Sequence, residues 1–287
     1  MSRPRLYDGL LTQHMAENRQ MAFLVGPRQV GKTSLCRERA AYLGWDNLDD
    51  RALILKGPAA VADRIGLDRL ARGLPTVAFD ELHKHARWKS FLKGFFDTYE
   101  KQVKILVTGS SRLDVWRKGG DSPMGRYFLY RVHPFSVGEV LHPAPSESML
   151  VPPTAIPDDE WNALWRHGGF PEPFVRRQDR FTTRWRGLRR QQLLREDVRE
   201  VARIHELGHL EMLAKLLADR SGGQLVLSNL AQDIQVSVDT VRRWVELLAS
   251  LHYGFVVRPW FANVAKSLRK EPKWFLRDWS EVDADGP

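Results

Sequence analysis

One run of eight residues, GPRQVGKT at positions 26–33, constrains this chain more than any other feature because it fits the pattern G-x-x-x-x-G-K-[ST]. The apolar run Met21–Val25 precedes it, and residues 34–43 after it have the composition and spacing of a helix. Glycines adopt the positive φ angles that turn backbone N–H groups inward, and the start of a helix attracts negative charge. Strand, loop and helix in this order therefore predict a site for a nucleoside triphosphate.

Two side chains of this run have expected roles in phosphate chemistry. Lys32 would reach the β- and γ-phosphates, and the Thr33 hydroxyl would hold Mg²⁺. The residues expected to bind the nucleotide, ATP, are Gly26, Pro27, Arg28, Gln29, Val30, Gly31, Lys32, Thr33 and Ser34 in the loop, with Asp80, Thr108 and Ser110 further along the chain. The alternative interpretation is a glycine turn without a ligand, which the flanking strand and helix patterns disfavour.

An acidic pair completes the pattern of an ATP-hydrolysing site. Residues 76–79 are apolar enough for a buried strand, and Asp80 and Glu81 follow them directly. Hydrolysis needs one carboxylate in the Mg²⁺ shell and another that polarises the attacking water, since phosphoryl transfer depends mainly on positioning and charge stabilisation. We expect Thr33 and Asp80 to bind Mg²⁺, Glu81 to activate water and Lys32 to neutralise phosphate charge.

Small hydroxyl residues follow a third apolar run, residues 104–107. All strands of a parallel sheet end at the same edge, where ligands bind. Thr108, Ser110 or Ser111 could therefore hydrogen-bond the γ-phosphate or the attacking water. The alternative is a plain serine-glycine turn that caps a helix over 112–118.

A further catalytic candidate is Arg126, which precedes a fourth apolar run at 127–132. An arginine placed there could stabilise transition-state charge in its own subunit or in a neighbouring subunit. The second option would require a homo-oligomer.

The pattern of the whole chain places these motifs in the first of two domains. A length of 287 residues allows two separate cores. Short apolar runs alternate with helical patterns over residues 20–140, which is typical of βαβ units and a parallel sheet. Prolines and serines then indicate a linker. We predict an AAA-like P-loop domain of the α/β class at 1–142, a linker at 143–160 and a mainly helical, winged-helix domain at 161–287.

A helix, tight turn and helix are expected within the second domain. Ser228 and Ser237 are natural N-caps for its two helices. Apolar positions 238, 241, 244, 245 and 248 form one stripe, which leaves Thr240, Arg242 and Arg243 facing outward where a recognition helix would enter a major groove. Residues 255–260, 266–270 and 273–276 could form the hairpin of the wing. DNA binding and protein packing both stay open for this segment.

The net charge of +9 is unevenly distributed. Residues 176–203 contain ten arginines and four acidic residues. This arginine stripe could attract DNA or another polyanion. A solvated helical face is the alternative.

No stretch approaches eighteen consecutive apolar residues, and the first twenty residues lack the apolar core of a signal peptide. The prediction is therefore a soluble, cytoplasmic protein that makes no membrane contact. The single cysteine, Cys36, cannot form an internal disulfide and is expected to be a small buried hydrophobe.

Two other motifs suggest different activities. HELGH at 205–209 fits H-E-x-x-H, in which two histidines bind zinc and the glutamate is the base of a metalloprotease. Residues 210–215 lack the third ligand of one such class, so a zinc protease is the remote alternative to exposed histidines on an amphipathic helix. DELH at 80–83 also fits a helicase box, but the helical second half does not indicate a second RecA-like lobe.

Several motifs together resemble one known family. They are GPRQVGKT at 26–33, VAFDEL at 77–82, VTGSSRLDV at 107–115, GRYFLYRVHPFSVGE at 125–139 and GGFPEPF at 168–174. The chain resembles the bacterial and archaeal AAA-type ATP-binding proteins that carry a C-terminal domain of unknown function 4143. The resemblance implies a P-loop fold with an additional strand and a catalytic glutamate, ATP as the nucleotide, and a winged-helix segment. Family members continue into a nuclease-like portion, so this chain is expected to be C-terminally short.

The sequence thus predicts an Mg²⁺-dependent ATPase that couples hydrolysis to movement of a winged-helix module, with DNA as one candidate partner. The alternative is a nucleotide-dependent switch that binds DNA or a protein and turns over little. The two differ in whether Glu81 supports appreciable hydrolysis.

Overall fold

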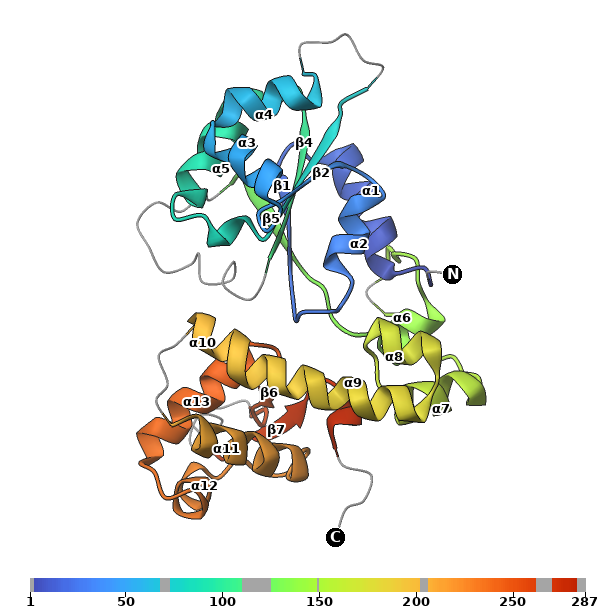
Figure 1. Cartoon of the computed structure of the whole chain (residues 1–287). Coiled ribbons are helices and arrows are strands. Elements are labelled where there is room, and N and C mark those ends of the chain that lie inside the picture. The colour runs from blue at the N-terminus through green and yellow to red at the C-terminus, as the bar shows by residue number, and fades with distance from the viewer. Residues whose placement is uncertain are drawn as a thin grey trace. The chain divides into compact units, whose positions relative to one another are not determined.

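The computed structural model describes residues 3–67, 73–109, 125–148, 150–201, 206–261 and 270–282. The chain divides into two compact units (Figure 1). Each unit has its own core of buried apolar side chains. The first unit comprises Met1–His133 and Gly138–Thr154, and the second comprises Pro134–Val137 and Ala155–Pro287. Among the helices that the structure describes, none combines the length and apolar character that a membrane crossing requires.

The first unit is built on a five-stranded parallel sheet. Its strands are β1 (Met21–Val25), β2 (Ala41–Gly44), β3 (Thr76–Asp80), β4 (Lys104–Gly109) and β5 (Tyr127–Arg131), in the order β2-β3-β4-β1-β5. Strand β4 therefore separates β1, which leads into the glycine loop, from β3, which ends at the acidic pair. This is the additional strand that the family resemblance implies, and it confirms the predicted α/β class.

Helices cover both faces of this sheet (Figure 1). Helices α1 (Leu6–Glu17) and α2 (Lys32–Arg37) lie on one face. Helices α3 (Leu48–Leu55), α4 (Pro58–Ile65) and α5 (Trp88–Tyr99) lie on the other face. The short helices η1 (Leu82–Lys84) and α6 (Val137–Leu141) follow strands β3 and β5.

Side-chain alternation along the strands sorts apolar and polar residues between the two faces. Odd-numbered strand residues form one core with α3, α4 and α5, and its members include Met21, Phe23, Val25, Ile54, Val61, Val77, Phe79, Phe91, Leu92, Phe95, Phe96, Ile105 and Val107. The even-numbered residues Tyr42, Asp80 and Thr108 project to the opposite face, toward α2. Strand pairing sets Asp80 of β3 beside Gly44 of β2 and Thr108 of β4. Three neighbouring strands therefore bring the side chains of Tyr42, Asp80 and Thr108 to one place.

The sequence-based prediction of a helix over residues 34–43 was wrong. Helix α2 ends at Arg37, and strand β2 begins at Ala41. Parallel pairing of Ala41–Gly44 with residues 77–80 of β3 overrides the local helical preference, because it extends the sheet and buries Leu43 and Gly44. Cys36 is buried, as expected.

The second unit is mainly helical. Its elements are α7 (Asp158–His167), α8 (Pro171–Arg176), α9 (Asp179–Gln192), the π-helical turn η3 (Leu193–Asp197), α10 (Val198–Val201), α11 (Leu207–Asp219), α12 (Leu227–Asp233), α13 (Val238–Ser250), strands β6 (Gly254–Val257) and β7 (Lys273–Leu276), and η4 (Trp279–Glu281). Strands β6 and β7 pair antiparallel, as the expected hairpin requires, while residues 262–269 lie outside the described part.

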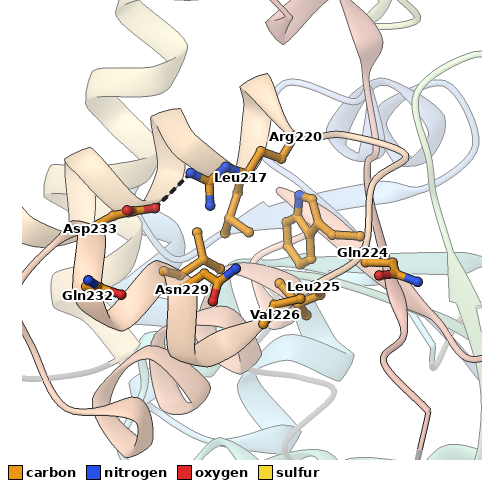
Figure 2. A pocket seen from close by; sticks show the side chains of 10 residues that line it. Leu217, Arg220, Gln224, Leu225, Val226, Asn229, Gln232 and Asp233 are labelled. Atoms are coloured by element: carbon orange, nitrogen blue, oxygen red, sulfur yellow. Dashed lines mark hydrogen bonds and ion pairs between the residues drawn. The ribbon is translucent and has the colours of Figure 1, made fainter.

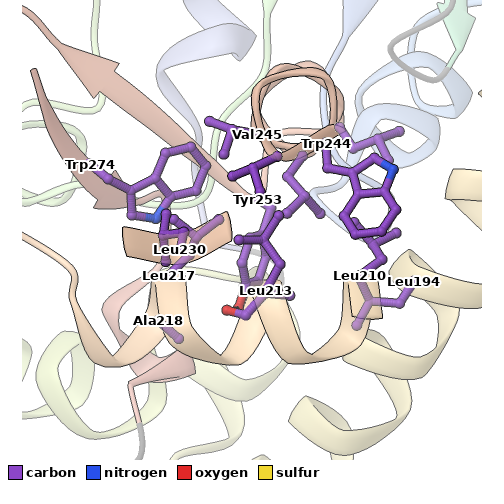
Figure 3. Close-up of a cluster of buried hydrophobic side chains, with 14 of the residues drawn as sticks. Leu194, Leu210, Leu213, Leu217, Ala218, Leu230, Trp244, Val245, Tyr253 and Trp274 are labelled. Atoms are coloured by element: carbon purple, nitrogen blue, oxygen red, sulfur yellow. The ribbon is translucent and has the colours of Figure 1, made fainter. Parts of the chain in front are cut away.

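A large apolar core holds the C-terminal helices and the hairpin together (Figure 3). Trp274 of β7 and Tyr253 before β6 pack with leucines of α11 and with Val245 of α13. The Tyr253 hydroxyl donates to the Ala214 carbonyl at 3.0 Å, which satisfies a buried polar group within this core. Helices α11, α12 and α13 and the hairpin therefore form one packed body.

The boundary between the two units does not fall at a single point in the sequence. The described residues of 143–157 contain no helix or strand, in keeping with their prolines, and α7 begins at Asp158. Residues 134–137 belong to the second unit although they precede this segment: the Phe135 N–H donates to the Gly169 carbonyl at 2.6 Å.

Candidate nucleotide-binding site

The glycine loop has the backbone conformation that its sequence predicts. Gly26, Gln29 and Gly31 have φ angles of 154°, 64° and 95°. A Cβ atom at Gly26 would lie 2.2 Å from the Val132 carbonyl oxygen, so a side chain there would require the end of β5 to move. Loop shape and neighbouring backbone together restrict this position to glycine.

The side chain of Lys32 crosses the glycine loop and is held by backbone carbonyls at the start of that loop. The ammonium group is buried and its Nζ atom donates to the carbonyls of Gly26 at 2.9 Å and Pro27 at 2.7 Å. The charge is therefore located where the chain turns from β1 into the loop. An ammonium with three donors at this point can neutralise a phosphate that the loop amides bind.

Asp80 receives hydroxyl groups from three elements. Thr33 Oγ1, on α2, donates to Asp80 Oδ2 at 3.0 Å. The Tyr42 hydroxyl, on β2, donates to the same oxygen, and Thr108 Oγ1, on β4, donates to Oδ1. These bonds fix the carboxylate beside Thr33, the residue expected to share an ion with it.

The role expected for Thr108 needs correction. Its side chain is fully buried within the sheet and bonded to Asp80, so it does not face a γ-phosphate in this structure. Thr108 positions the carboxylate instead. Ser110, the other hydroxyl expected at this edge, lies outside the described residues, as do Ser111 and the helix expected over 112–118.

The backbone of Glu81 has a conformation that is uncommon for residues other than glycine. Its φ angle is 54°, in the left-handed region that costs a non-glycine residue free energy. The Glu81 N–H donates to the Thr108 carbonyl at 3.1 Å, which holds this turn against β4. The carboxylate of Glu81 lies beside Lys84, with 3.5 Å between Glu81 Oε2 and Lys84 Nζ. Burial raises the pKa of the Glu81 carboxyl, and the nearby lysine opposes this shift.

The residues present fit Mg²⁺. This cation prefers oxygen ligands and is usually bound through one or two carboxylates together with substrate phosphates and water. Thr33 and Asp80 provide a hydroxyl and a carboxylate that already lie within hydrogen-bonding distance. The described residues contain no group of three or more histidine, cysteine, aspartate or glutamate side chains able to hold a metal alone, so an ion here would depend on the phosphates.

Arg126 does not lie at this site in its own chain. Its carbonyl accepts from the N–H of Met21, the first residue of β1, whereas the glycine loop follows the last residue of β1. Its guanidinium pairs with Asp97 of α5 at 2.7 Å. Arg126 is therefore at the opposite edge of the sheet, and only the role in a neighbouring subunit is left as a hypothesis.

The HELGH segment does not have the geometry of a zinc-protease helix. Helix α11 begins at Leu207, so Glu206 precedes the helix instead of lying on it. Glu206 and His209 are both exposed, and His205 lies outside the described residues. Glu206 thus lies outside the helix that carries His209, and the exposed His209 agrees with the interpretation that was preferred over a zinc protease.

The residues expected to contact DNA face solvent at the start of α13. Ser237 caps this helix by accepting from the Thr240 N–H at 3.1 Å, as predicted. Arg242 pairs with Asp239, and Arg243 donates to Thr240 Oγ1 at 3.3 Å. The buried stripe of Val241, Trp244, Val245 and Leu248 lies on the other side of the helix, whereas Val238, which was expected to join it, is exposed.

The N-cap predicted at Ser228 was wrong, because α12 begins one residue earlier, at Leu227, after the extended residue Val226. Burial of Leu230 and Ala231 sets the register of this helix, and Ser228 lies in its first turn.

The arginine stripe is largely engaged within the second unit. Arg176, Arg177 and Arg195 pair with acidic residues of their own unit, and Arg189 and Arg190 pair with Glu281. Arg189 and Glu281 are both buried. Among the described residues of the stripe, these five arginines neutralise acids of their own unit, which weakens the case for a polyanion surface along the whole stripe.

A cavity of about 540 Å³ lies in the second unit, where α11, α12 and β7 meet (Figure 2). Its polar lining consists of Gln224, Asn229, Gln232 and the ion pair between Arg220 and Asp233, at 2.7 Å. No motif in the sequence indicated it.

The fold and the loop define the class of the first unit: a parallel α/β domain with a P-loop and an additional strand, β4, between the strand that leads into the loop and the acidic strand. Residues 18–141 match a family model described as an AAA domain, which supports an AAA-type P-loop family for this part of the chain. Residues 158–281 match a different model, described as a domain of unknown function (DUF8612). The predicted relation to domain 4143 is therefore not confirmed.

Two curated relatives are the uncharacterized proteins Rv2008c of Mycobacterium tuberculosis and Mb2031c of Mycobacterium bovis. Each is 24% identical over 263 residues, which is 90% of this chain and 54% of the relative. The chain thus spans about half the length of these relatives.

Two solved structures show weaker likeness. One is the Aeropyrum pernix ORC1 protein in complex with DNA, 13% identical with a TM-score of 0.38, covering 96% of this chain and 90% of that one. The other is C. elegans PCH-2, 15% identical with a TM-score of 0.31, covering 83% of this chain and 66% of that one. Both TM-scores are below 0.5, so neither likeness bears on the ligands of this chain.

Proposed function

We propose that the first unit binds ATP with Mg²⁺ and hydrolyses it. The observation that carries this proposal is the hydrogen bond between Thr33, in the helix after the glycine loop, and Asp80, at the end of β3. It joins two motifs that lie far apart in sequence into one oxygen-rich site. Glu81 follows Asp80 directly, at the edge of the sheet where ligands of parallel sheets bind.

Each residue has a distinct part in this mechanism. Loop amides and the Lys32 ammonium bind the β- and γ-phosphates and stabilise the charge that spreads over the γ-phosphoryl oxygens in the transition state. Thr33 and Asp80 would hold Mg²⁺, which would supply charge neutralisation and alignment of the phosphates. The Glu81 carboxylate orients a water molecule for attack on the γ-phosphorus and takes up its proton, while the bond from the γ-phosphorus to the β–γ bridging oxygen breaks and ADP leaves.

The hydroxyl groups of Tyr42 and Thr108 act through Asp80. They hold its two oxygens, so that the carboxylate needs little rearrangement when the ion is bound. This adds Tyr42 to the residues that the motifs indicated and gives Thr108 a positioning role.

Equilibrium nucleotide binding tests the proposal. Calorimetry with ADP and ATP, with and without Mg²⁺, should show binding that Mg²⁺ strengthens. Lys32→Ala should weaken binding by at least about ten-fold, because it removes a charged donor from a buried site. Lys56→Ala, which changes an exposed lysine after α3, should leave the affinity unchanged. Equal affinity of wild-type protein and Lys32→Ala would contradict the proposal.

A second candidate function concerns the C-terminal part. We propose that α11, α12, α13 and the β6–β7 hairpin form a winged helix that contacts DNA through α13, so that the nucleotide site acts as a switch or motor for this module. The supporting observation is the exposed pair Arg242 and Arg243, with the half-buried Thr240, beside a buried apolar stripe. A DNA-binding isotherm insensitive to salt would contradict it, since phosphate contacts release counterions.

A further inference from the structure

Arg5, which no motif in the sequence indicated, is buried next to the glycine loop. Its guanidinium pairs with Glu139 of α6 at 2.7 Å and 3.2 Å, which fixes the plane of the group. The same group donates to the Val30 carbonyl at 2.9 Å and to the His133 carbonyl at 2.6 Å. One side chain thus joins the N-terminal segment, the glycine loop and the residues after β5.

The backbone around Arg5 is fixed as firmly as its side chain. The Arg5 N–H donates to Asp8 Oδ2 at 2.8 Å, and the Leu6 N–H donates to Glu139 Oε1 at 3.0 Å. The Tyr7 hydroxyl donates to the Arg131 carbonyl at 2.6 Å and accepts from the His133 N–H at 3.0 Å. Because both the chain and the acid partner are anchored, the guanidinium has little freedom to leave the Val30 carbonyl.

The carbonyl that Arg5 binds belongs to the peptide between Val30 and Gly31. A trans peptide is planar, and its C=O and N–H point in opposite directions. A guanidinium that holds the Val30 oxygen therefore also sets the direction of the Gly31 N–H. In a loop that binds phosphate through backbone amides, the direction of one N–H is part of the binding site.

This peptide needs such a restraint. Rotation of a peptide plane changes ψ of the residue before it and φ of the residue after it. Gly31 has a φ of 95°, and glycine tolerates either sign of φ, so the sequence alone does not prevent the rotation. A buried charged donor on the carbonyl opposes it.

We propose that Arg5 is a positioning residue that orients the Val30–Gly31 peptide and thereby sets the affinity of the loop for the β-phosphate of the nucleotide. This inference rests on the proposed function. The competing explanation is that the pair of Arg5 and Glu139 only stabilises the fold, as buried ion pairs can.

The ratio of the dissociation constants for AMP and ADP separates these explanations. It measures the contribution of the β-phosphate, and it does not change when a variant merely contains less folded protein. We would determine it by calorimetry on the full chain in EDTA, so that the loop is measured without Mg²⁺. The wild-type protein should bind ADP more tightly than AMP.

Arg5→Met should reduce this ratio by about ten-fold, because a charge-assisted hydrogen bond that orients the loop is lost. Arg5→Lys should also reduce it, since a single ammonium cannot reproduce the planar pairing with Glu139. Should Arg5→Met fail to fold, Glu139→Gln retains the side-chain shape and should lower the ratio several-fold. Thermal unfolding monitored by circular dichroism identifies the folded variants.

Arg39→Met is the matched control. Arg39 also attaches α1 to the rest of the first unit, through Asp8 at 2.6 Å, but the backbone carbonyl that its guanidinium binds is that of Leu35 in α2 and not one of the loop. The ratio of the dissociation constants for AMP and ADP should be the same in Arg39→Met as in the wild type. A wild-type ratio in folded Arg5→Met and Arg5→Lys would overturn the inference while leaving the proposed function intact. A wild-type protein that binds AMP and ADP equally would overturn the proposed function itself.

Discussion

Replacing Tyr42 by phenylalanine should weaken Mg²⁺ binding without weakening nucleotide binding. Tyr42 reaches Asp80 from β2, and its hydroxyl shares Oδ2 with Thr33. Burial, and to a lesser extent the adjacent Asp80 carboxylate, raise the pKa of Tyr42, so the hydroxyl stays protonated and donates at every pH at which the protein would be assayed. The substitution removes this donor and keeps the ring.

The size of the effect follows from the contact. A hydrogen bond to a charged group contributes about 1.5–3 kcal/mol, and Tyr42 is only partly buried, which favours the lower end of that range. About 1.5 kcal/mol corresponds to a ten-fold change in a binding constant. The Mg²⁺ concentration that half-saturates the ADP complex should therefore rise about ten-fold in Tyr42→Phe.

Calorimetric titration of Mg²⁺ into the ADP complex measures this concentration, and titration of ADP in EDTA measures the loop alone. Tyr130→Phe is the matched control, because Tyr130 lies on β5 and its hydroxyl bonds to His14 at 2.9 Å, not to Asp80. An unchanged Mg²⁺ affinity in Tyr42→Phe would refute the reasoning. An equal loss of ADP affinity in EDTA would show that Tyr42 acts on the fold and not on the ion site.

Three further predictions concern protonation and helix capping. Burial raises the pKa of the Glu81 carboxyl, so kcat should fall toward acid at a higher pH than a glutamate of ordinary pKa, near 4.3, would give; a kcat profile that is level down to pH 4.5 would contradict this. Burial, helped by Glu281, raises the pKa of Asp278 to about 6, whereas an unfolded aspartate titrates near 3.9, so the folded state loses stability as pH rises through this interval. Asp278→Asn should therefore gain roughly 3 kcal/mol in unfolding free energy relative to wild type between pH 3 and pH 8, measured by urea denaturation, and a pH-independent difference would argue against it. Ser237→Ala should lower the unfolding free energy of the second unit by about 1 kcal/mol, since it removes the cap of α13, and an unchanged denaturation midpoint would show that the cap contributes nothing.

The sequence predicted the parallel sheet well because buried strands have a strong local signature. Strand β1 has the predicted bounds, and β3, β4 and β5 each start at the predicted residue. Their apolar runs are bounded by loop residues, so composition and position are enough. Strand β2 was missed because its four residues continue the pattern of the preceding helix, and only pairing with β3 makes them a strand.

Some residues of the candidate site could likewise be predicted from the sequence, and others could not. Lys32, Thr33, Asp80 and Glu81 belong to motifs in which the spacing itself carries the chemistry. Tyr42 could not be predicted, because its contact with Asp80 depends on the register of β2. Arg5 and Glu139 are separated by 134 residues, and no local pattern relates them.

Predictions from the sequence alone were least reliable where they depended on the edge of the sheet at which a residue lies or on the direction in which its side chain points. Arg126 stands before a strand, and only the sheet shows that this is the edge opposite the loop. Thr108 stands at the correct edge, but alternation along β4 turns its side chain into the sheet and onto Asp80.

Single-turnover hydrolysis of ATP by the wild-type protein and by Glu81→Gln tests the central claim most directly. The account predicts measurable wild-type hydrolysis, and a loss of about 10²- to 10⁴-fold in Glu81→Gln with the affinity for ATP retained, because the substitution removes the general base and leaves the loop and the ion site in place. Comparable hydrolysis by both proteins, or no appreciable hydrolysis by the wild type with Mg²⁺ present, would contradict it.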